Sequence, residues 1–343
     1  MIGVVTIVFF LFYVLPGDPA RMMLDQRENQ DQLNLINSKY GFDLPVVKQY
    51  FFYLNDLSLI SIHSTDLKSF TNIEKKNISF ITIFSNEKSK IVFKKPYLRQ
   101  SFNKTGKSVS SIISEVLFNT IVLAVSAIFI ALIIGVFLGV FSAINKDNFI
   151  DSFISIISAL GMAVPSFFSA ILMAWVFGFW LADYTGLSMT GSLYVLDDFG
   201  ESEDLNIKNL ILPSITLGIR PLAVITQLMR NSLIEVMQMD YIRTATAKGL
   251  PFKKVIVKHA LKNSFNPVIT AASGWFASML AGAVFVEYVF GWNGIGKLVV
   301  DSLNQMDLPV LMGCVLVIAV FFVLINIIVD LIYRYLNPKI TYS

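Results

Sequence analysis

Residues 117–144 read LFNTIVLAVSAIFIALIIGVFLGVFSAI and contain no charged side chain. About 20 consecutive apolar residues are enough for a helix to cross the roughly 30 Å hydrocarbon core of a bilayer. Only helices and closed barrels satisfy their backbone hydrogen bonds in lipid, and this run lacks the ten-residue alternation of barrel strands. The stretch therefore predicts a transmembrane helix.

Further apolar runs repeat this signal along the chain, in which 55% of the residues are hydrophobic and 29 are Phe. They cover residues 1–15, 149–181, 210–236, 267–290 and 309–335. A mean hydropathy of +0.65 excludes an ordinary soluble protein. We expect an all-α integral membrane protein with six transmembrane helices. It divides into a first transmembrane helix (1–16), an extracytoplasmic segment (17–115) and a five-helix core (116–343).

The first apolar run is short for a membrane span, and a secretory signal peptide is the alternative reading. The run has no basic leader, and YVLPGDPA (13–20) is a poor cleavage site. We therefore interpret residues 1–16 as a transmembrane helix, and the sequence leaves open where that helix begins.

The charges of the loops predict the orientation, because cytoplasmic loops are enriched in Lys and Arg. Residues 230–262 contain seven Lys or Arg and two acids, whereas residues 183–209 contain one Lys and six acids. We expect the first loop and both termini in the cytoplasm, and the second loop outside. The segment 17–115 then lies outside, although it is net basic, since long loops translocate largely regardless of charge. An insertion at about residues 57–95 carries the strand-like patches ISFITIF (78–84) and KIVF (90–93).

Small residues recur every fourth position in the second and fifth spans. Such a face lets another helix backbone approach closely, so we expect dense helix packing at both places. The second span carries Ala127, Ala131, Gly135, Gly139 and Ala143, and the fifth carries Gly274, Ser278 and Gly282.

The fourth span has a polar face formed by Thr216, Arg220, Gln227 and Asn231. Arg220 lies close to the midplane, where a charge costs about 2.5–3.5 kcal/mol on insertion scales. Such residues face a cavity or a partner. The four residues are candidates for a water-lined translocation pathway, and the alternative is a buried Arg paired with an acid or with helix carbonyls.

Motifs for catalysis, nucleotide binding or metal binding are missing. NKTGKS (103–108) lacks the earlier Gly of a phosphate-binding loop, GWNGIG (291–296) suits a turn, and no HExxH or Ser/His/Asp set occurs. Cys314 is the single cysteine and there are two histidines, so no disulfide within the chain and no metal site are expected. We expect neither catalytic residues nor a cofactor bound by this chain.

The basic loop between the fourth and fifth spans reads DYIRTATAKGLPFKKVIVKHALKNSFNP (240–267). It predicts a short helix over 239–248 capped by Asp240, a left-handed Gly249, and a stop at Pro251. A second helix follows over 252–262, with one side formed by Val255, Ile256 and His259. A loop lying on anionic lipid would explain the charge. It would not explain the small residues before the Gly, which favour a cytoplasmic docking helix.

These residues resemble a known family. YIRTATAKGL (241–250) resembles the coupling-loop signature of permease subunits of binding-protein-dependent ATP-binding-cassette importers, in its dipeptide/oligopeptide/nickel form. The broader signature has Glu-Ala-Ala where this chain has Arg243, Thr244 and Ala245, and Asn293 replaces a frequent Pro. Further matches are FYVLPGDPA (12–20), KYGFDLP (39–45), HALKNSFNPVIT (259–270), GAVFVEYVFGWNGIGKL (282–298) and DLIYRYLNPKI (330–340).

The resemblance implies a type I importer permease fold in a bacterial cytoplasmic membrane, moving peptides by alternating access. Its expected partners are a second homologous permease subunit, two cytoplasmic ATPase subunits that use ATP and Mg²⁺, and an external solute-binding protein. Membrane lipid is a further partner, and no nucleic acid is expected. The ATPase-coupling loop is placed at residues 237–263. Its expected contact residues are Asp240, Tyr241, Arg243, Thr244, Ala245, Ala247, Lys248, Gly249, Leu250 and Pro251.

Other functions stay open at this point. The same architecture could carry nickel, glutathione or an oligosaccharide, because these importers share the motifs. A stand-alone channel or secondary carrier is less well supported, since such carriers show repeats with broken helices at matching places and no such repeat is visible.

Overall fold

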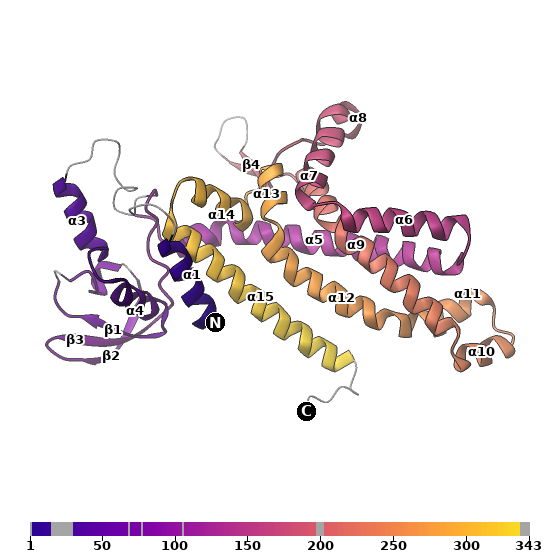
Figure 1. Ribbon diagram of the computed structural model, residues 1–343, viewed down its shortest axis with the longest axis horizontal. Coiled ribbons are helices and arrows are strands. Elements are labelled where there is room, and N and C mark those ends of the chain that lie inside the picture. The colour runs from indigo at the N-terminus through magenta and orange to yellow at the C-terminus, as the bar shows by residue number, and fades with distance from the viewer. Residues whose placement is uncertain are drawn as a thin grey trace. The chain divides into compact units, whose positions relative to one another are not determined.

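A computed structural model describes residues 2–14, 30–67, 69–76, 78–104, 106–196 and 202–336 (Figure 1). The chain forms two compact units, Met1–Val116 with Leu298–Val320, and Leu117–Lys297 with Phe321–Ser343. The expected motif at 12–20 and the end of the motif at 330–340 lie mostly outside the described residues.

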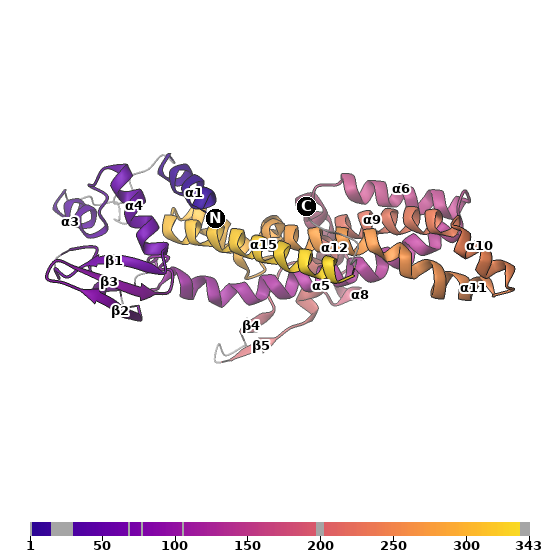
Figure 2. The same cartoon turned by 90° about the horizontal axis from the view of Figure 1, so that it is seen from below.

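The first unit combines helices with a small antiparallel sheet of order β1-β3-β2 (Figure 2). The patches at 78–84 and 90–93 form β2 and β3, which confirms the strand prediction, while β1 was not predicted. The elements are α1 (Ile2–Val14), α3 (Gln30–Tyr40), α4 (Val46–Leu57), β1 (Ile60–Ser64), η1 (Glu74–Lys76), β2 (Phe80–Ser85) and β3 (Ser89–Lys94).

The second unit is helical apart from a two-stranded hairpin. Its elements are α6 (Phe149–Ala163), α7 (Ser166–Trp175), η2 (Val176–Trp180), α8 (Ala182–Thr185), β4 (Tyr194–Leu196), β5 (Glu203–Leu205), α9 (Lys208–Met237), α10 (Asp240–Ala247), α11 (Phe252–Lys254), η3 (Val255–Ala260), α12 (Leu261–Gly282) and α13 (Val284–Phe290). Residues of α5 (Val109–Ile144), α14 (Ile295–Asn304) and α15 (Leu308–Leu336) belong to both units. Helix α9 is the central helix of the second unit and packs against α6, α7 and α12.

Each apolar run of the sequence forms helix in the described part of the chain. Helices α5, α9 and α15 are each long and apolar enough to cross a membrane, and α1 is a shorter apolar helix. The remaining two runs form bent pairs, α6 with α7–η2 and α11–α12 with α13. The all-α membrane class is therefore confirmed, and so is the prediction that each apolar run is helical. Two of the runs are bent pairs of helices and not single straight helices.

The run at 149–181 shows why a straight span was the wrong expectation there. Its two halves meet at an angle of 107°. The break falls at Val164 and Pro165, and both residues have extended backbone angles. A proline pushes the preceding residue out of the helical region and cannot donate a backbone hydrogen bond. The chain therefore turns sharply at this point and starts a new helix at Ser166.

Close packing of α5 on α9 follows from the small residues of the second span. A Cβ added at Gly139 would lie 2.6 Å from the carbonyl oxygen of Thr226, and one added at Gly135 would lie 2.9 Å from the carbonyl oxygen of Leu222. The two backbones therefore approach as the spacing predicts. In the fifth span the expectation is wrong within this chain, because Gly274 has no neighbour within 4 Å and Ser278 is exposed.

Gly139 and Gly274 make a matched pair for a stability test. Changing Gly139→Ala forces the α9 backbone away, and we expect the free energy of unfolding to fall by about 1–3 kcal/mol, the usual cost of overpacking. Gly274→Ala has open space and gains helix propensity, so it should leave stability equal or higher. Thermal unfolding of the purified chain in detergent measures both. Equal effects at the two positions would contradict the packing.

Candidate functional site

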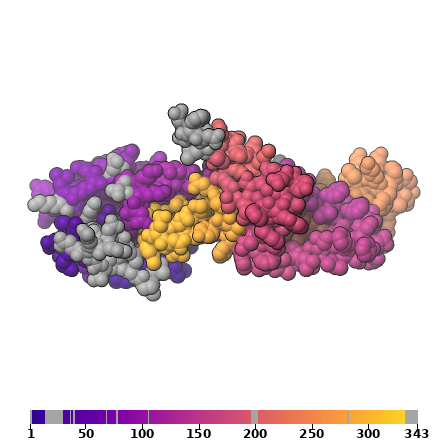
Figure 3. All heavy atoms as spheres, turned by 90° about the horizontal axis from the view of Figure 1, so that it is seen from above, coloured from indigo at the N-terminus to yellow at the C-terminus, as the bar shows by residue number. Residues whose placement is uncertain are grey.

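The loop between the fourth and fifth spans folds as a protruding helical knob, here the coupling segment, residues 240–260. Figure 3 shows it, in light orange, at the right-hand edge of the view, against the surface of the α5–α6 region. Its first helix, α10, follows α9 after only Gln238 and Met239. Met239, not Asp240, is the N-cap residue, which corrects the expectation. Asp240 lies in the first turn, where its carboxylate favours the helix N-terminus and lies 3.5 Å from the Arg243 guanidinium.

The turn after α10 forms as predicted. Gly249 has a φ of +75°, a left-handed conformation that glycine adopts without a Cβ penalty, and its N–H donates to the carbonyl of Thr246 at 2.9 Å. Pro251 then caps α11 with a φ of −62°. The second helix was expected to cover residues 252–262. It does not end at residue 262, because α11 continues through the π-helical η3 into α12. The coupling segment is therefore joined directly to both α9 and α12.

One face of α10 is buried against the chain itself. Ile242 and Ala245 belong to an apolar cluster with Val236 of α9 and with Val255 and Ala260 of η3. The small size of Ala245 thus serves internal packing, so the expectation that it meets another protein is wrong. In addition, the Asn263 amide of α12 donates to the Tyr241 hydroxyl at 2.7 Å. These contacts make α10 a part of the α9–α12 body.

The opposite face of α10 is open. Gly249 has no neighbour within 4 Å of an added Cβ, and Leu250 is half-buried. The predicted contact residues that remain exposed are Asp240, Tyr241, Arg243, Thr244, Ala247, Lys248, Gly249 and Pro251. The knob therefore offers a mixed surface of small, polar and basic groups, which suits contact with another protein.

A buried ion pair beside the knob was missed by the sequence analysis. Arg230 of α9 binds the carboxylate of Asp151 on α6 through two hydrogen bonds, both of 2.6 Å. The Ser142 hydroxyl of α5 donates to the same carboxylate at 2.5 Å, and the N–H of Asp147 donates at 3.0 Å. Asp151 is only 4% exposed. This arrangement, here the α6–α9 clamp, joins α5, α6 and α9 about two turns before the end of α9.

The proposed pathway residues lie along α9, but not all are accessible. Thr216 is buried, and its hydroxyl donates to the carbonyl of Leu212 at 2.7 Å. Arg220 and Asn231 are exposed, and Gln227 is half-buried. Arg220 makes no ion pair or hydrogen bond within the described residues, which disfavours a buried Arg with an internal partner. Three of the four residues therefore share an open face.

A second buried carboxylate links α5, α13 and α14. Glu287 of α13 is 0% exposed and accepts hydrogen bonds from the Thr120 hydroxyl at 2.7 Å and the N–H of Lys297 at 3.1 Å. A Cβ at Gly294 would lie 2.5 Å from this carboxylate. The motif GWNGIG thus forms a tight turn around Glu287, and the turn was predicted from the sequence. The role of Glu287 was not predicted.

No group of three or more His, Cys, Asp or Glu side chains is placed to hold a metal ion in the described ranges.

Comparison with known proteins places these features in a family. The family model "Binding-protein-dependent transport system inner membrane component" matches residues 135–342, and the model of its N-terminal part matches residues 1–66. A dipeptide transport system permease protein of Alkalihalophilus pseudofirmus is 32% identical, over 100% of this chain and 96% of that protein. An oligopeptide transport system permease protein of Bacillus subtilis is 31% identical, over 100% and 95%.

A solved structure supports the fold. A chain of the MetNI methionine ABC transporter, in an inward facing conformation, superimposes with a TM-score of 0.53 at 15% identity, covering 66% of this chain and 97% of that chain. At this identity the match shows the fold alone. The family models and the full-length relatives show that the protein belongs to the family of inner-membrane components of binding-protein-dependent ABC importers.

Proposed function

We propose that the chain is a permease subunit that moves dipeptides and oligopeptides into a bacterial cell. The relatives that match over its whole length are named as dipeptide and oligopeptide permeases, which supports this substrate class. The observation that carries the proposal is the coupling segment, which has one face packed on the spans and the other face open. Both termini and this segment lie in the cytoplasm, in agreement with the basic charge of residues 230–262.

In this proposal two ATPase subunits and a second, homologous permease subunit complete the importer. The open face of α10 seats in a groove of one ATPase subunit, and Arg243 and Lys248 make polar or ionic contacts there. Because Ile242 and Ala245 pack against α9 and η3, a movement of α10 is transmitted to both helices as a rigid body. ATP-driven closure of the ATPases thus reorients the spans toward an external solute-binding protein, and hydrolysis resets them.

Uptake by the complete importer tests the substrate. The importer is reconstituted in proteoliposomes with its binding protein, and accumulation of a radiolabelled dipeptide is followed with and without ATP. We expect ATP-dependent accumulation that other peptides inhibit and that Ni²⁺ and glutathione do not. Accumulation of Ni²⁺, glutathione or an oligosaccharide in place of the dipeptide would overturn the peptide assignment.

Arg220 is proposed to line the pathway, where its charge attracts a peptide carboxylate. We expect Arg220→Ala to lower dipeptide uptake about tenfold, the size of one lost charge-assisted hydrogen bond, and Arg220→Lys to keep part of it. The same Arg220→Ala change removes a charge that costs about 2.5–3.5 kcal/mol in a membrane, so the amount of inserted chain should not fall. Size-exclusion profiles of the variant measure that amount. Uptake at the wild-type rate in both variants would contradict the pathway role.

A further inference from the structure

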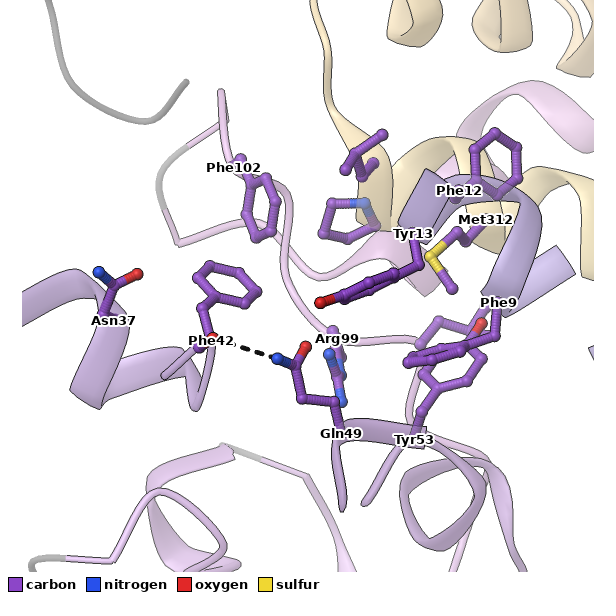
Figure 4. A pocket seen from close by; sticks show the side chains of 13 residues that line it. Phe9, Phe12, Tyr13, Asn37, Phe42, Gln49, Tyr53, Arg99, Phe102 and Met312 are labelled. Carbon is purple, nitrogen blue, oxygen red and sulfur yellow. Dashed lines mark hydrogen bonds between the residues drawn. The ribbon is translucent and has the colours of Figure 1, made fainter. Parts of the chain in front are cut away.

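A pocket of about 360 Å³ lies within the first unit (Figure 4). Its volume falls in the range of small-molecule sites. Phe9, Phe12 and Tyr13 of α1 line one side, and Met312 of α15 lies beside them. The remaining lining residues are Asn37, Phe42, Gln49, Tyr53, Leu98, Arg99, Phe102, Leu308 and Pro309.

The walls of the pocket are fixed by hydrogen bonds. The Gln49 amide donates to the carbonyls of Phe42 and Leu44, at 3.1 and 2.8 Å, and so fixes the turn that carries Phe42. On the other side Asp307, only 4% exposed, accepts from the Ser101 hydroxyl and from the N–H of Phe102 at 3.1 Å. The aromatic rings of Phe42 and Phe102 then meet edge to face, 5.9 Å apart. These contacts fix the positions of Phe42 and Phe102, so the fold itself defines this wall of the pocket.

A surplus of positive charge lies behind one wall. The buried carboxylate of Asp56 pairs with Lys76 and, at 3.1 Å, with Nε of Arg99. Lys94 donates to the carbonyls of Asp56 and Ser58, and burial lowers its pKa to about 8, so it is still mostly charged at neutral pH. Two cations thus pair with the carboxylate of Asp56, and a third binds the backbone carbonyl of the same residue. Among them Arg99 lines the pocket, and a φ of +68° makes its backbone conformation an uncommon one.

One more polar group in the wall lacks a partner. Tyr53 is 3% exposed, and its hydroxyl makes no hydrogen bond within the described residues. A buried hydroxyl without a partner is costly, and a ligand oxygen can supply one. Arg99 and Tyr53 together therefore offer donors to an anionic or strongly polar group, while the phenylalanines offer an apolar surface.

The position of the pocket points to the class of ligand. It lies beside Tyr13, in the last turn of α1, and Leu308, where α15 begins, and both helices are apolar. Apolar helices leave the hydrocarbon layer at their ends, where phospholipid headgroups lie and where Tyr is enriched. We propose that this pocket binds an anionic phospholipid, with the phosphate at Arg99 and the first part of an acyl chain against the aromatic rings.

Binding of defined lipids to the full chain tests the proposal. The chain is prepared in nanodiscs of phosphatidylcholine with increasing phosphatidylglycerol, and retained lipid is counted by native mass spectrometry after release into detergent. We expect one retained phosphatidylglycerol and at least about tenfold weaker retention of it in Arg99→Gln, the loss expected for one charge-assisted hydrogen bond. The control Lys90→Gln removes a cation of similar exposure that pairs with Glu74 and does not line the pocket, and should retain lipid normally.

A second variant keeps the test decisive if Arg99→Gln does not fold. Met312→Trp fills the pocket and leaves every charge in place, and should also release the lipid. Equal retention of phosphatidylcholine and phosphatidylglycerol, or normal retention in both pocket variants, would overturn the proposal. Displacement of the lipid by a hydrophobic dipeptide at a lower concentration than by free phosphatidylglycerol would overturn it as well, and would assign the pocket to a peptide. None of these outcomes depends on transport.

Discussion

Replacing Asp151 with Asn is expected to lower the free energy of unfolding by about 3–5 kcal/mol, the usual cost of breaking a buried ion pair on one side. The Arg230 guanidinium would lose its counter-charge and one of its two acceptors, because the amide NH2 of Asn cannot replace a carboxylate oxygen in either 2.6 Å hydrogen bond. Arg230→Ala should have a similar effect, since Asp151 would then be the unpaired charge. Chemical denaturation of the purified chain in detergent measures the change.

The control is an ion pair with the same chemistry on the surface. Asp240 and Arg243 lie 3.5 Å apart and are both largely exposed, so Asp240→Asn should have little effect on stability. A double variant, Asp151→Leu with Arg230→Met, tests the cause. It removes both charges, and should be much less destabilised than either single change predicts. An Asp151→Asn chain as stable as Asp240→Asn would contradict the buried pair.

The α6–α9 clamp also bears on coupling. Arg230 lies two turns before the end of α9, and α10 follows after two residues. A loosened clamp would let the end of α9 move without α6, so force applied at α10 would be lost before it reached the rest of the spans. We therefore expect Arg230→Lys, which keeps one contact, to reduce ATP-coupled uptake more than it reduces ATPase binding.

Lys248→Glu is expected to abolish most ATP-dependent uptake while the chain stays folded. Lys248 is exposed directly after α10, and its side chain has no ion pair or hydrogen bond among the described residues, so the change acts on a partner and not on the fold. A reversed charge inside a protein interface leaves an unpaired or repelled group, which costs binding. Co-purification of the ATPase subunits and dipeptide uptake measure the effect.

Lys146→Glu provides the matched control. Lys146 is exposed in the short loop between α5 and α6, and the chemical change is identical. It should leave ATPase binding and uptake near the wild-type level. If both reversals weakened ATPase binding equally, a general electrostatic attraction would replace the specific seating of α10.

Much of this architecture was predictable, because the signals are local. Apolar runs longer than the bilayer predict helices from composition alone, and Gly135 and Gly139 predict the close approach of a second helix. The turn at Gly249 followed from a single glycine before a proline. The bend at Val164 could also have been predicted, because Pro165 restricts the residue before it. It was missed because the sequence is apolar on both sides of the break and looks like one continuous span.

Other features depend on which helices become neighbours. Asp151 and Arg230 are 79 residues apart, and no spacing rule pairs them. Ala245 and Ala247 look alike in the sequence, yet Ala245 is buried and Ala247 is exposed, because only the packing of α10 on α9 and η3 sets its inner face. The charges around Asp56 come from three separate segments of the first unit. The pocket at Arg99 was therefore invisible to the sequence analysis.

Cross-linking from α10 tests the docking of this helix most directly. Cys314 is the single cysteine and is buried, so a Cys314→Ser chain gives a clean background for one new thiol at Ala247→Cys. A photoactivated cross-linker attached to that thiol should capture an ATPase subunit in the assembled importer. The same reagent at Lys146→Cys should capture much less, and Ala245→Cys should hardly react because that position is buried. Capture at position 247 no greater than at position 146 would contradict the coupling role of α10.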